Sequence, residues 1–181
     1  MSTLITTNAN ITNVNTGTIK DSTGNTTAMT INSTGQVVMP KRIHVRAVGA
    51  NDLSGTPSYI NLSGEASMQM SIIEEDGDGN GATYYNTSTG VFTAPVAGIY
   101  FCAFATLVQT AATADWRLFK KPAGGSDAIF QRFFNSGTRG WNGATTVLLG
   151  VGDEVRFAQP NDAQDVYSGL RYAHVTYTLI G

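Results

Sequence analysis

Charged side chains, cysteine and long apolar runs are all scarce in this sequence of 181 residues. Asp, Glu, Lys and Arg account for only 13% of it, whereas roughly a quarter is usual for a soluble domain. The polar surface must therefore be built from Thr, Ser, Asn, Gln and Gly. These residues favour turns and β-rich surfaces and are poor formers of long helices.

Each shortage excludes a class of protein. The net charge is −2, and the basic residues cluster only at Lys41–Arg42 and Lys120–Lys121, so nucleic-acid binding is not expected. Cys102 is the single cysteine, which excludes a disulfide framework and a cysteine-based zinc site. The first ten residues lack a charged segment followed by an apolar one, so no secretory signal is expected. No apolar run reaches the roughly 18 residues that a membrane span needs.

Catalytic motifs are absent as well. The two histidines, His44 and His174, each sit in a strand-like pattern without a recognisable set of partner residues. Residues 150–155, GVGDEV, lack the spacing of a phosphate-binding loop and are typical of a tight turn before a strand. Cys102 lies among apolar and aromatic residues, which indicates an inert buried thiol. We therefore expect no enzymatic activity and no cofactor.

Residues 1–40 differ from the rest of the chain. Lys20 and Asp21 are their only charged residues, and they contain no aromatic ring. Such a segment cannot bury enough apolar surface to fold alone. Two related stretches, IKDSTGNT and INSTGQVV, each combine a β-branched residue with a Ser-Thr-Gly turn. They predict short hairpins or an extended arm that orders against partner chains, with a disordered tail as the alternative. The aliphatic residues expected to anchor this arm are Ile11, Val14, Ile19, Ile31 and Val37.

After Pro40 the pattern changes to short strands. Turn signals such as Ser136–Gly137 and Gly150 to Asp153 separate them. Met68, Met70 and Ile72 alternate with polar residues and are expected to share one face. About eight to ten strands without a helical period indicate a sandwich or jelly roll. The expected strands cover residues 43–48, 67–73, 90–108, 115–121, 128–134, 144–149, 154–159 and 172–180.

One stretch within this pattern resembles the signature of the C1q domain family. An Asn, four aromatic residues and a Gly fall at the family's spacings: Asn80, Tyr85, Phe92, Gly98, Tyr100 and Phe104. Two positions depart from the signature, because Glu74 and Cys102 stand where the family has Phe. The segments LLGVGDEVRF and HVTYTLIG also resemble the family's last two strands. The resemblance covers about residues 60–181.

The resemblance implies an all-β, C1q/TNF-like jelly-roll sandwich of about ten strands that forms tight homotrimers. Closure into a trimer would also hide edges and apolar faces that a lone sandwich exposes. The aromatic residues expected to supply both the core and the subunit contact are Tyr85, Phe92, Tyr100 and Phe104.

The N-terminal segment, ending in INSTGQVVMPKRIHVRA, resembles the lead-in of C1q-like structural proteins of tailed bacteriophages. It predicts an anchoring arm over residues 1–40 and a C1q-like jelly-roll domain over residues 41–181. The function expected is that of a virion protein at the particle surface: a trimeric capsid decoration (cement) protein that binds the major capsid protein or tail components. The alternatives are a short tail fibre or tail tip that binds a host receptor or glycan, and a soluble C1q-like lectin.

A partner-binding loop is predicted at residues 135–143, NSGTRGWNG. This Gly-rich stretch would present Arg139 and Trp141, residue types that often anchor interfaces. The alternative is that Trp141 covers the core or the trimer contact. Trp116, Arg117 and Arg132 are of the same residue types.

A candidate calcium-binding stretch lies at residues 74–81, EEDGDGNG. Asp76, Asp78 and Asn80 fit the first half of a calcium-binding loop. An EF-hand is excluded, because Thr87 stands where the bidentate Glu belongs and no helix signal flanks the loop. The stretch is therefore interpreted as a polar connection into the central strands, with a weak calcium site kept open. Asp162 and Asp165 are a second, weaker candidate pair.

Overall fold

The computed structural model describes strands in two compact units, Met1–Lys41 and Arg42–Gly181. The described residues are 18–20, 27–31, 34, 37–38, 42–49, 59–60, 67–159, 166–167 and 172–181.

The first unit contains a small antiparallel sheet. Its strands β1 (Thr18–Lys20), β2 (Thr27–Ile31) and β3 (Val37–Val38) pair in the order β1-β2-β3. Of the predicted anchoring residues, Ile19, Ile31 and Val37 fall in these strands, whereas Ile11 and Val14 lie outside the described residues. Their role in anchoring stays a prediction.

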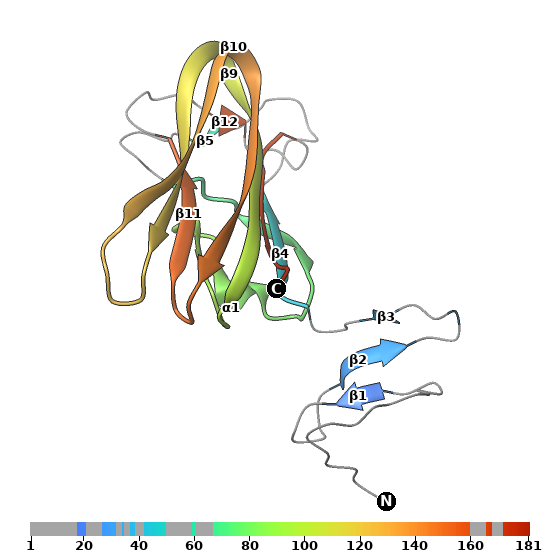
Figure 1. Cartoon of the computed structure of the whole chain (residues 1–181). Coiled ribbons are helices and arrows are strands. Elements are labelled where there is room, and N and C mark those ends of the chain that lie inside the picture. The colour runs from blue at the N-terminus through green and yellow to red at the C-terminus, as the bar shows by residue number, and fades with distance from the viewer. Residues whose placement is uncertain are drawn as a thin grey trace, which may run out of the picture. The chain divides into compact units, whose positions relative to one another are not determined.

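The second unit is a sandwich built around one long hairpin. Its strands β9 (Gly98–Lys121) and β10 (Ala128–Leu149) run antiparallel along nearly their whole length, and each contributes to both sheets (Figure 1). Sheet I consists of β6 (Ile72–Asp76), β4 (His44–Val48), β13 (His174–Leu179), residues 98–107 of β9 and residues 140–149 of β10. Sheet II consists of β7 (Tyr85–Asn86), β8 (Val91–Thr93), β11 (Glu154–Ala158), residues 115–121 of β9 and residues 128–134 of β10.

Three short elements complete this unit. The one-turn helix α1 (Gly81–Tyr84) leads into β7. Strands β5 (Tyr59–Ile60) and β12 (Val166–Tyr167) pair with each other, and β12 also contacts β9. Among the described residues, no helix has the length and apolar character needed to cross a membrane.

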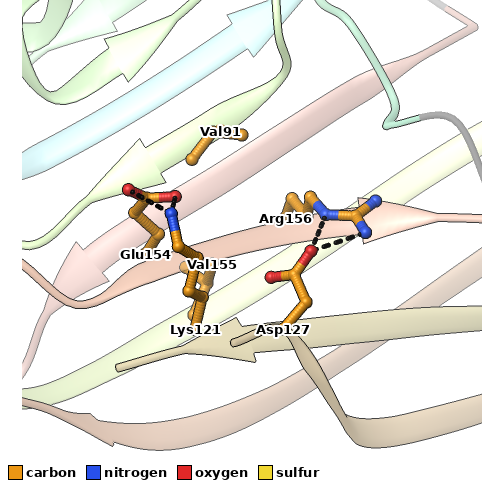
Figure 2. Close-up of a pocket in the computed structure, with 6 residues that line it drawn as sticks. All are labelled: Val91, Lys121, Asp127, Glu154, Val155 and Arg156. Atoms are coloured by element: carbon orange, nitrogen blue, oxygen red, sulfur yellow. Dashed lines mark hydrogen bonds and ion pairs between the residues drawn. The ribbon is translucent and has the colours of Figure 1, made fainter. Parts of the chain in front are cut away.

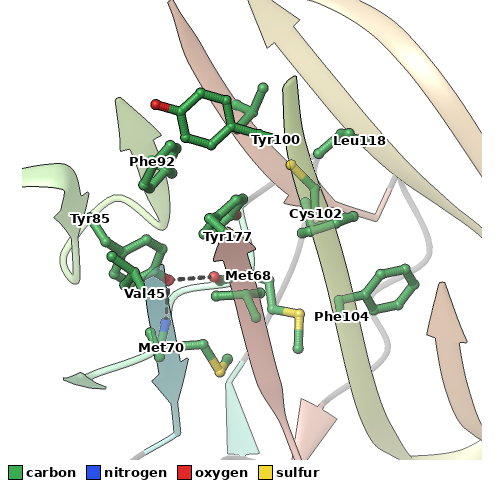
Figure 3. Close-up of a cluster of buried hydrophobic side chains, with 14 of the residues drawn as sticks. Val45, Met68, Met70, Tyr85, Phe92, Tyr100, Cys102, Phe104, Leu118 and Tyr177 are labelled. Atoms are coloured by element: carbon green, nitrogen blue, oxygen red, sulfur yellow. Dashed lines mark hydrogen bonds between the residues drawn. The ribbon is translucent and has the colours of Figure 1, made fainter. Parts of the chain in front are cut away.

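The core lies between the two sheets and is rich in aromatic rings (Figure 3). Alternate residues of β4, β11, β13 and the first part of β9 point inward, as expected for strands with one buried face. Tyr177 of sheet I stacks on Phe92 of sheet II, with ring centroids 4.7 Å apart. The Tyr85 hydroxyl donates to the Met68 carbonyl (3.1 Å) and accepts from the Met70 amide (3.0 Å). The Tyr85 hydroxyl thus provides hydrogen-bond partners for the backbone of Met68 and Met70, which precede β6.

Three predictions about strands are wrong. The expected strands 90–108 and 115–121 are instead divided between β8 and one continuous strand, β9. The Ser136–Gly137 signal does not end a strand, because β10 continues through it with register irregularities between Asn135 and Gly140. Gly137 has a φ of 68°, and the irregularities absorb extra residues while pairing continues. Met68 and Met70 are buried as expected, but Ile72 is 40% exposed. Ile72 belongs to β6, which begins after the irregular stretch that carries the two methionines.

Candidate functional site

The outer face of sheet I carries an exposed apolar cluster. Leu148 of β10 lies opposite Ile99 of β9, and the backbone of Ile180 bonds to that of Ile99. Phe101 follows two residues along β9 on the same face, since Tyr100 and Cys102 point into the core. Leu148 is 68% exposed, and the other three members are also exposed. We call Ile99, Phe101, Leu148 and Ile180 the sheet I cluster.

The other half of this face is polar. His44 contacts Thr178 through Nδ1 (2.7 Å) and Glu75 through Nε2 (3.0 Å). Arg46, two residues along β4, forms an ion pair with Glu74. The outer face of sheet I therefore has an apolar part, the sheet I cluster, and a polar part in which the charged side chains form pairs. Sequence reasoning missed this network, because its members come from three strands whose register the sequence does not reveal.

A Thr–His–Glu contact of this kind resembles part of a catalytic triad, but the surroundings do not complete one. Thr178 and His44 lie opposite each other where two paired strands, β13 and β4, end and begin, on an open sheet face. A nucleophile also needs a substrate cleft and aligned donors for an oxyanion. The network is better explained as a set of cross-strand contacts that fix the side chains of the face.

A second exposed apolar group lies at the edge of sheet II. The first part of β10 pairs with β9 on one side and with no other strand among the described residues. Ile129, Phe130 and Phe134 of this edge are exposed, and Phe134 reaches 69%. Exposed aromatic residues on an open edge favour contact with another chain.

The hollow in Figure 2 lies over β8, β9 and β11 and contains four charged residues. Lys121 Nζ bonds both carboxylate oxygens of Glu154, at 3.2 and 3.1 Å. Arg156 bonds Asp127 through two nitrogens, at 3.0 and 2.8 Å, and its guanidinium lies 4.3 Å above the Phe119 ring. Because each charge already faces an opposite one, this hollow ties neighbouring strands together and offers no separate reactive group.

The aromatic residues predicted from the family signature all lie inside the sandwich. Tyr85, Phe92, Tyr100 and Phe104 are buried within the single chain. They form the core, as expected, but they are too deeply buried to make the subunit contact that was predicted for them. Ile99 and Phe101, which alternate with Tyr100 and Cys102 on β9, are exposed on the opposite face.

The predicted partner-binding loop is a strand, and Trp141 is not an exposed anchor. Trp141 is 1% exposed, packs edge-on against Trp116 and donates from Nε1 to the Thr138 carbonyl (3.0 Å). The strand continues through this segment, so alternation turns Trp141 into the core. The alternative interpretation, that it covers the core, is correct. Arg139 is exposed and its Nε donates to the Val108 carbonyl (3.2 Å).

The two aspartates of the EEDGDGNG stretch bond to their own loop. The Asp76 carboxylate accepts from the amides of Gly79 (2.9 Å) and Gly81 (2.7 Å). Asp78 accepts from the Asn80 amide (3.0 Å) and the Tyr84 hydroxyl (2.8 Å). Within the described part of the chain, no three His, Cys, Asp or Glu side chains are grouped to hold a metal ion. Asp162 and Asp165 lie outside the described residues.

Two further groups have pKa values set by their surroundings. Burial raises the pKa of the Cys102 thiol to about 12, so the thiolate needed for nucleophilic attack is suppressed. The pKa of Asp153 is lowered by hydrogen bonds from the amides of Gly150 (3.0 Å) and Ala123 (2.9 Å), and Lys120 adds an ion pair. The Asp153 carboxylate thus links the β9–β10 turn to the β10–β11 turn. The sequence GVGDEV predicts the second turn but not its link to the first.

This architecture, an all-β sandwich of two antiparallel sheets, defines a jelly roll of the C1q/TNF type. The C1q domain family profile matches residues 61–178. The chain belongs to the C1q domain family, and the predicted fold class is confirmed. A comparison with curated protein sequences found no match.

Solved structures share this fold at low sequence identity. A TNF protein of S. frugiperda, Eiger, aligns with a TM-score of 0.61 and 12% identity, over 78% of this chain and 94% of that one. The globular domain of zebrafish complement 1qA aligns at 0.54 and 19% identity, over 78% and 98%. Murine APRIL aligns at 0.55 and 13% identity, over 77% and 100%. These likenesses extend to the fold alone.

Proposed function

We propose that this chain is a non-enzymatic, homotrimeric structural protein of a virus particle, a phage capsid decoration protein held by its N-terminal arm. The observation that carries the trimer is the sheet I cluster, an exposed apolar group on a sheet whose inner face already has a complete core. The chain also belongs to the C1q domain family, and the resemblance to that family implies a homotrimer.

The geometry favours a cyclic contact between unlike surfaces. The sheet I cluster lies on a sheet face, whereas Ile129, Phe130 and Phe134 lie on the edge of sheet II. When one chain presents two different apolar surfaces, each copy can dock its edge on the face of the next, and the ring closes if the rotation allows. Closure would cover the open edge and the exposed face together.

Attachment to the particle is proposed to come from residues 1–40. This segment contains only two charged residues, so we expect its backbone and its aliphatic side chains to make the contacts with the partner. A segment of this kind binds by adding strands to a partner or lying along its surface. Three arms on one trimer would raise the effective concentration of each at the particle.

The experiment measures co-sedimentation of the purified protein with particles that lack it. We expect deletion of residues 2–38 to abolish binding while the remaining domain still assembles. A full-length chain in which the order of residues 2–38 is shuffled, at constant composition, is the matched control and is also expected to fail. Undiminished binding by the deletion variant would overturn the proposed role of the arm.

The receptor-binding alternative is weakened by the burial of Trp141. It now depends on the exposed side chain of Arg139. Adsorption of particles to host cells should be unchanged by Arg139→Ala under the proposed function. A marked loss of adsorption, with particle assembly intact, would favour the tail-fibre alternative.

A further inference from the structure

The only two histidines of the chain lie on the outer face of sheet I. His44 belongs to β4 and His174 to the neighbouring strand β13. Their strand neighbours Val45, Val175 and Tyr177 are buried in the core, which places both rings on the opposite side. Both histidines therefore lie on the face of sheet I that we propose for trimer assembly.

The two histidines have different surroundings. His44 is held between Thr178 and Glu75, so a proton on its ring would face a carboxylate. His174 lies opposite Val48 of β4 and Ala105 of β9. Among the described residues, no carboxylate forms a hydrogen bond or an ion pair with His174.

The groups that face His174 from the other strands make its protonation costly. On β4 the nearby charged group is Arg46, and on β6 the carboxylates of Glu74 and Glu75 already contact Arg46 and His44. The segments of β9 and β10 on this face contribute uncharged residues: Ala103, Ala105, Asn142 and Ala144. Burial first, and then Arg46, lower the pKa of His174 below its usual 6.5.

Protonation of His174 changes the charge of this face. Arg46 against Glu74 and Glu75 contributes a net charge of −1. A proton on the ring of His174 adds one positive charge close to Arg46, so acid places two like charges near each other on the face.

We propose that His174 is an acid-sensitive group of the assembly face, whose protonation weakens the contact between subunits. This inference rests on the proposed trimer. Contact with another subunit removes more water from a ring that is already half-buried, so assembly disfavours the charged form further. Assembly is then linked to the neutral ring, and the contact is lost as the pH falls through the pKa of His174 in the free chain, already below 6.5, toward its still lower pKa in the assembled chain. His44, which faces Glu75, serves as the internal control.

The test measures the rate of subunit exchange between two differently labelled samples of the full-length protein. We expect exchange at a pH of about 5 to be several-fold faster than at about 7.5, since each pKa unit between free and assembled His174 contributes at most about tenfold. His174→Gln should reduce this ratio to less than about twofold, whereas His44→Gln should retain the acid sensitivity. In the wild-type protein, the His174 ring proton resonance should titrate together with the rise in exchange, a measurement that needs no variant.

The outcomes separate the two proposals. A protein that is monomeric at neutral pH overturns the trimer and this inference with it. A trimer whose exchange is unaffected by pH overturns the inference alone. Equal acid sensitivity in wild type and His174→Gln also overturns it, because another group would then carry the effect.

Discussion

At the scale of single residues, stability depends on whether buried polar atoms find partners. The hydroxyls of Tyr85 and Tyr177 both lie in the core, but only the Tyr85 hydroxyl has hydrogen-bond partners among the described residues. Desolvation raises the pKa of both phenols above the usual 10, so both stay protonated at ordinary pH. The two tyrosines therefore form a natural pair for comparison.

We predict opposite effects for the two Tyr→Phe substitutions. Tyr85→Phe leaves the Met68 carbonyl and the Met70 amide without this partner and should lower the free energy of unfolding by about 1–3 kcal/mol. Tyr177→Phe removes an unsatisfied buried hydroxyl and should leave that free energy unchanged or raise it by about 1 kcal/mol. Denaturant unfolding of both variants measures the difference. A larger loss for Tyr177→Phe than for Tyr85→Phe would contradict this assignment.

Asp153 provides a prediction with a pH dependence. Its pKa in the folded chain is below the usual 3.8, so its stabilisation is complete above 3.8 and is lost as the pH falls toward the lowered value. Asp153→Asn should lower the melting temperature at neutral pH by several degrees, and the gap to wild type should narrow in acid. Glu154→Gln, which removes a partly exposed ion pair with Lys121, is the control and should cost less than about 1 kcal/mol.

At the scale of strands and turns, a glycine at the β7–β8 turn is constrained in two ways. Gly90 has a φ of 69°, and an added Cβ would lie 2.8 Å from the Met68 carbonyl oxygen. Gly124, in the β9–β10 turn, has a φ of 73° but open space around it. Gly124→Ala should therefore cost only the backbone strain, about 1–2 kcal/mol. Gly90→Ala should cost clearly more in thermal or denaturant unfolding, and equal losses would contradict the role of the Met68 contact.

The strands themselves were largely predictable, and their ends and register were not. The alternation in IHVRAV and HVTYTLI correctly indicated β4 and β13, because one buried face leaves a period of two. The Ser136–Gly137 signal was misread, since a glycine with positive φ serves a bulge as well as a turn. Because this signal divides β10 into two shorter strands in the prediction, Trp141 falls in a predicted loop at the surface.

On the outer face of sheet I, which we propose for trimer assembly, exposure could be predicted from the sequence but register could not. Ile99, Phe101 and Leu148 alternate with core residues, so their exposure could have been predicted from the period of two. Their proximity depends on the pairing of β9 with β10, and the His44–Glu75 contact depends on the pairing of β4 with β6. Register arises from the packing of the whole sandwich and leaves no signal in either strand alone.

At the scale of the whole molecule, we propose that exposed apolar surface on sheet I drives trimer formation. Leu148 and Val151 are a matched pair, because they are 68% and 65% exposed and only three residues apart. Leu148 belongs to the sheet I cluster, whereas Val151 lies in the turn between β10 and β11. A charge placed at Leu148 must be desolvated on assembly, and one placed at Val151 stays in water.

The most direct test is the mass of the full-length protein in solution by light scattering, at neutral pH. Three chains of 19.2 kDa predict about 58 kDa for wild type and for Val151→Glu. Leu148→Glu should give the mass of one chain, with an unchanged β-sheet circular dichroism spectrum. A wild-type protein with the mass of a single chain, or a Leu148→Glu variant that remains a full trimer, would contradict the account.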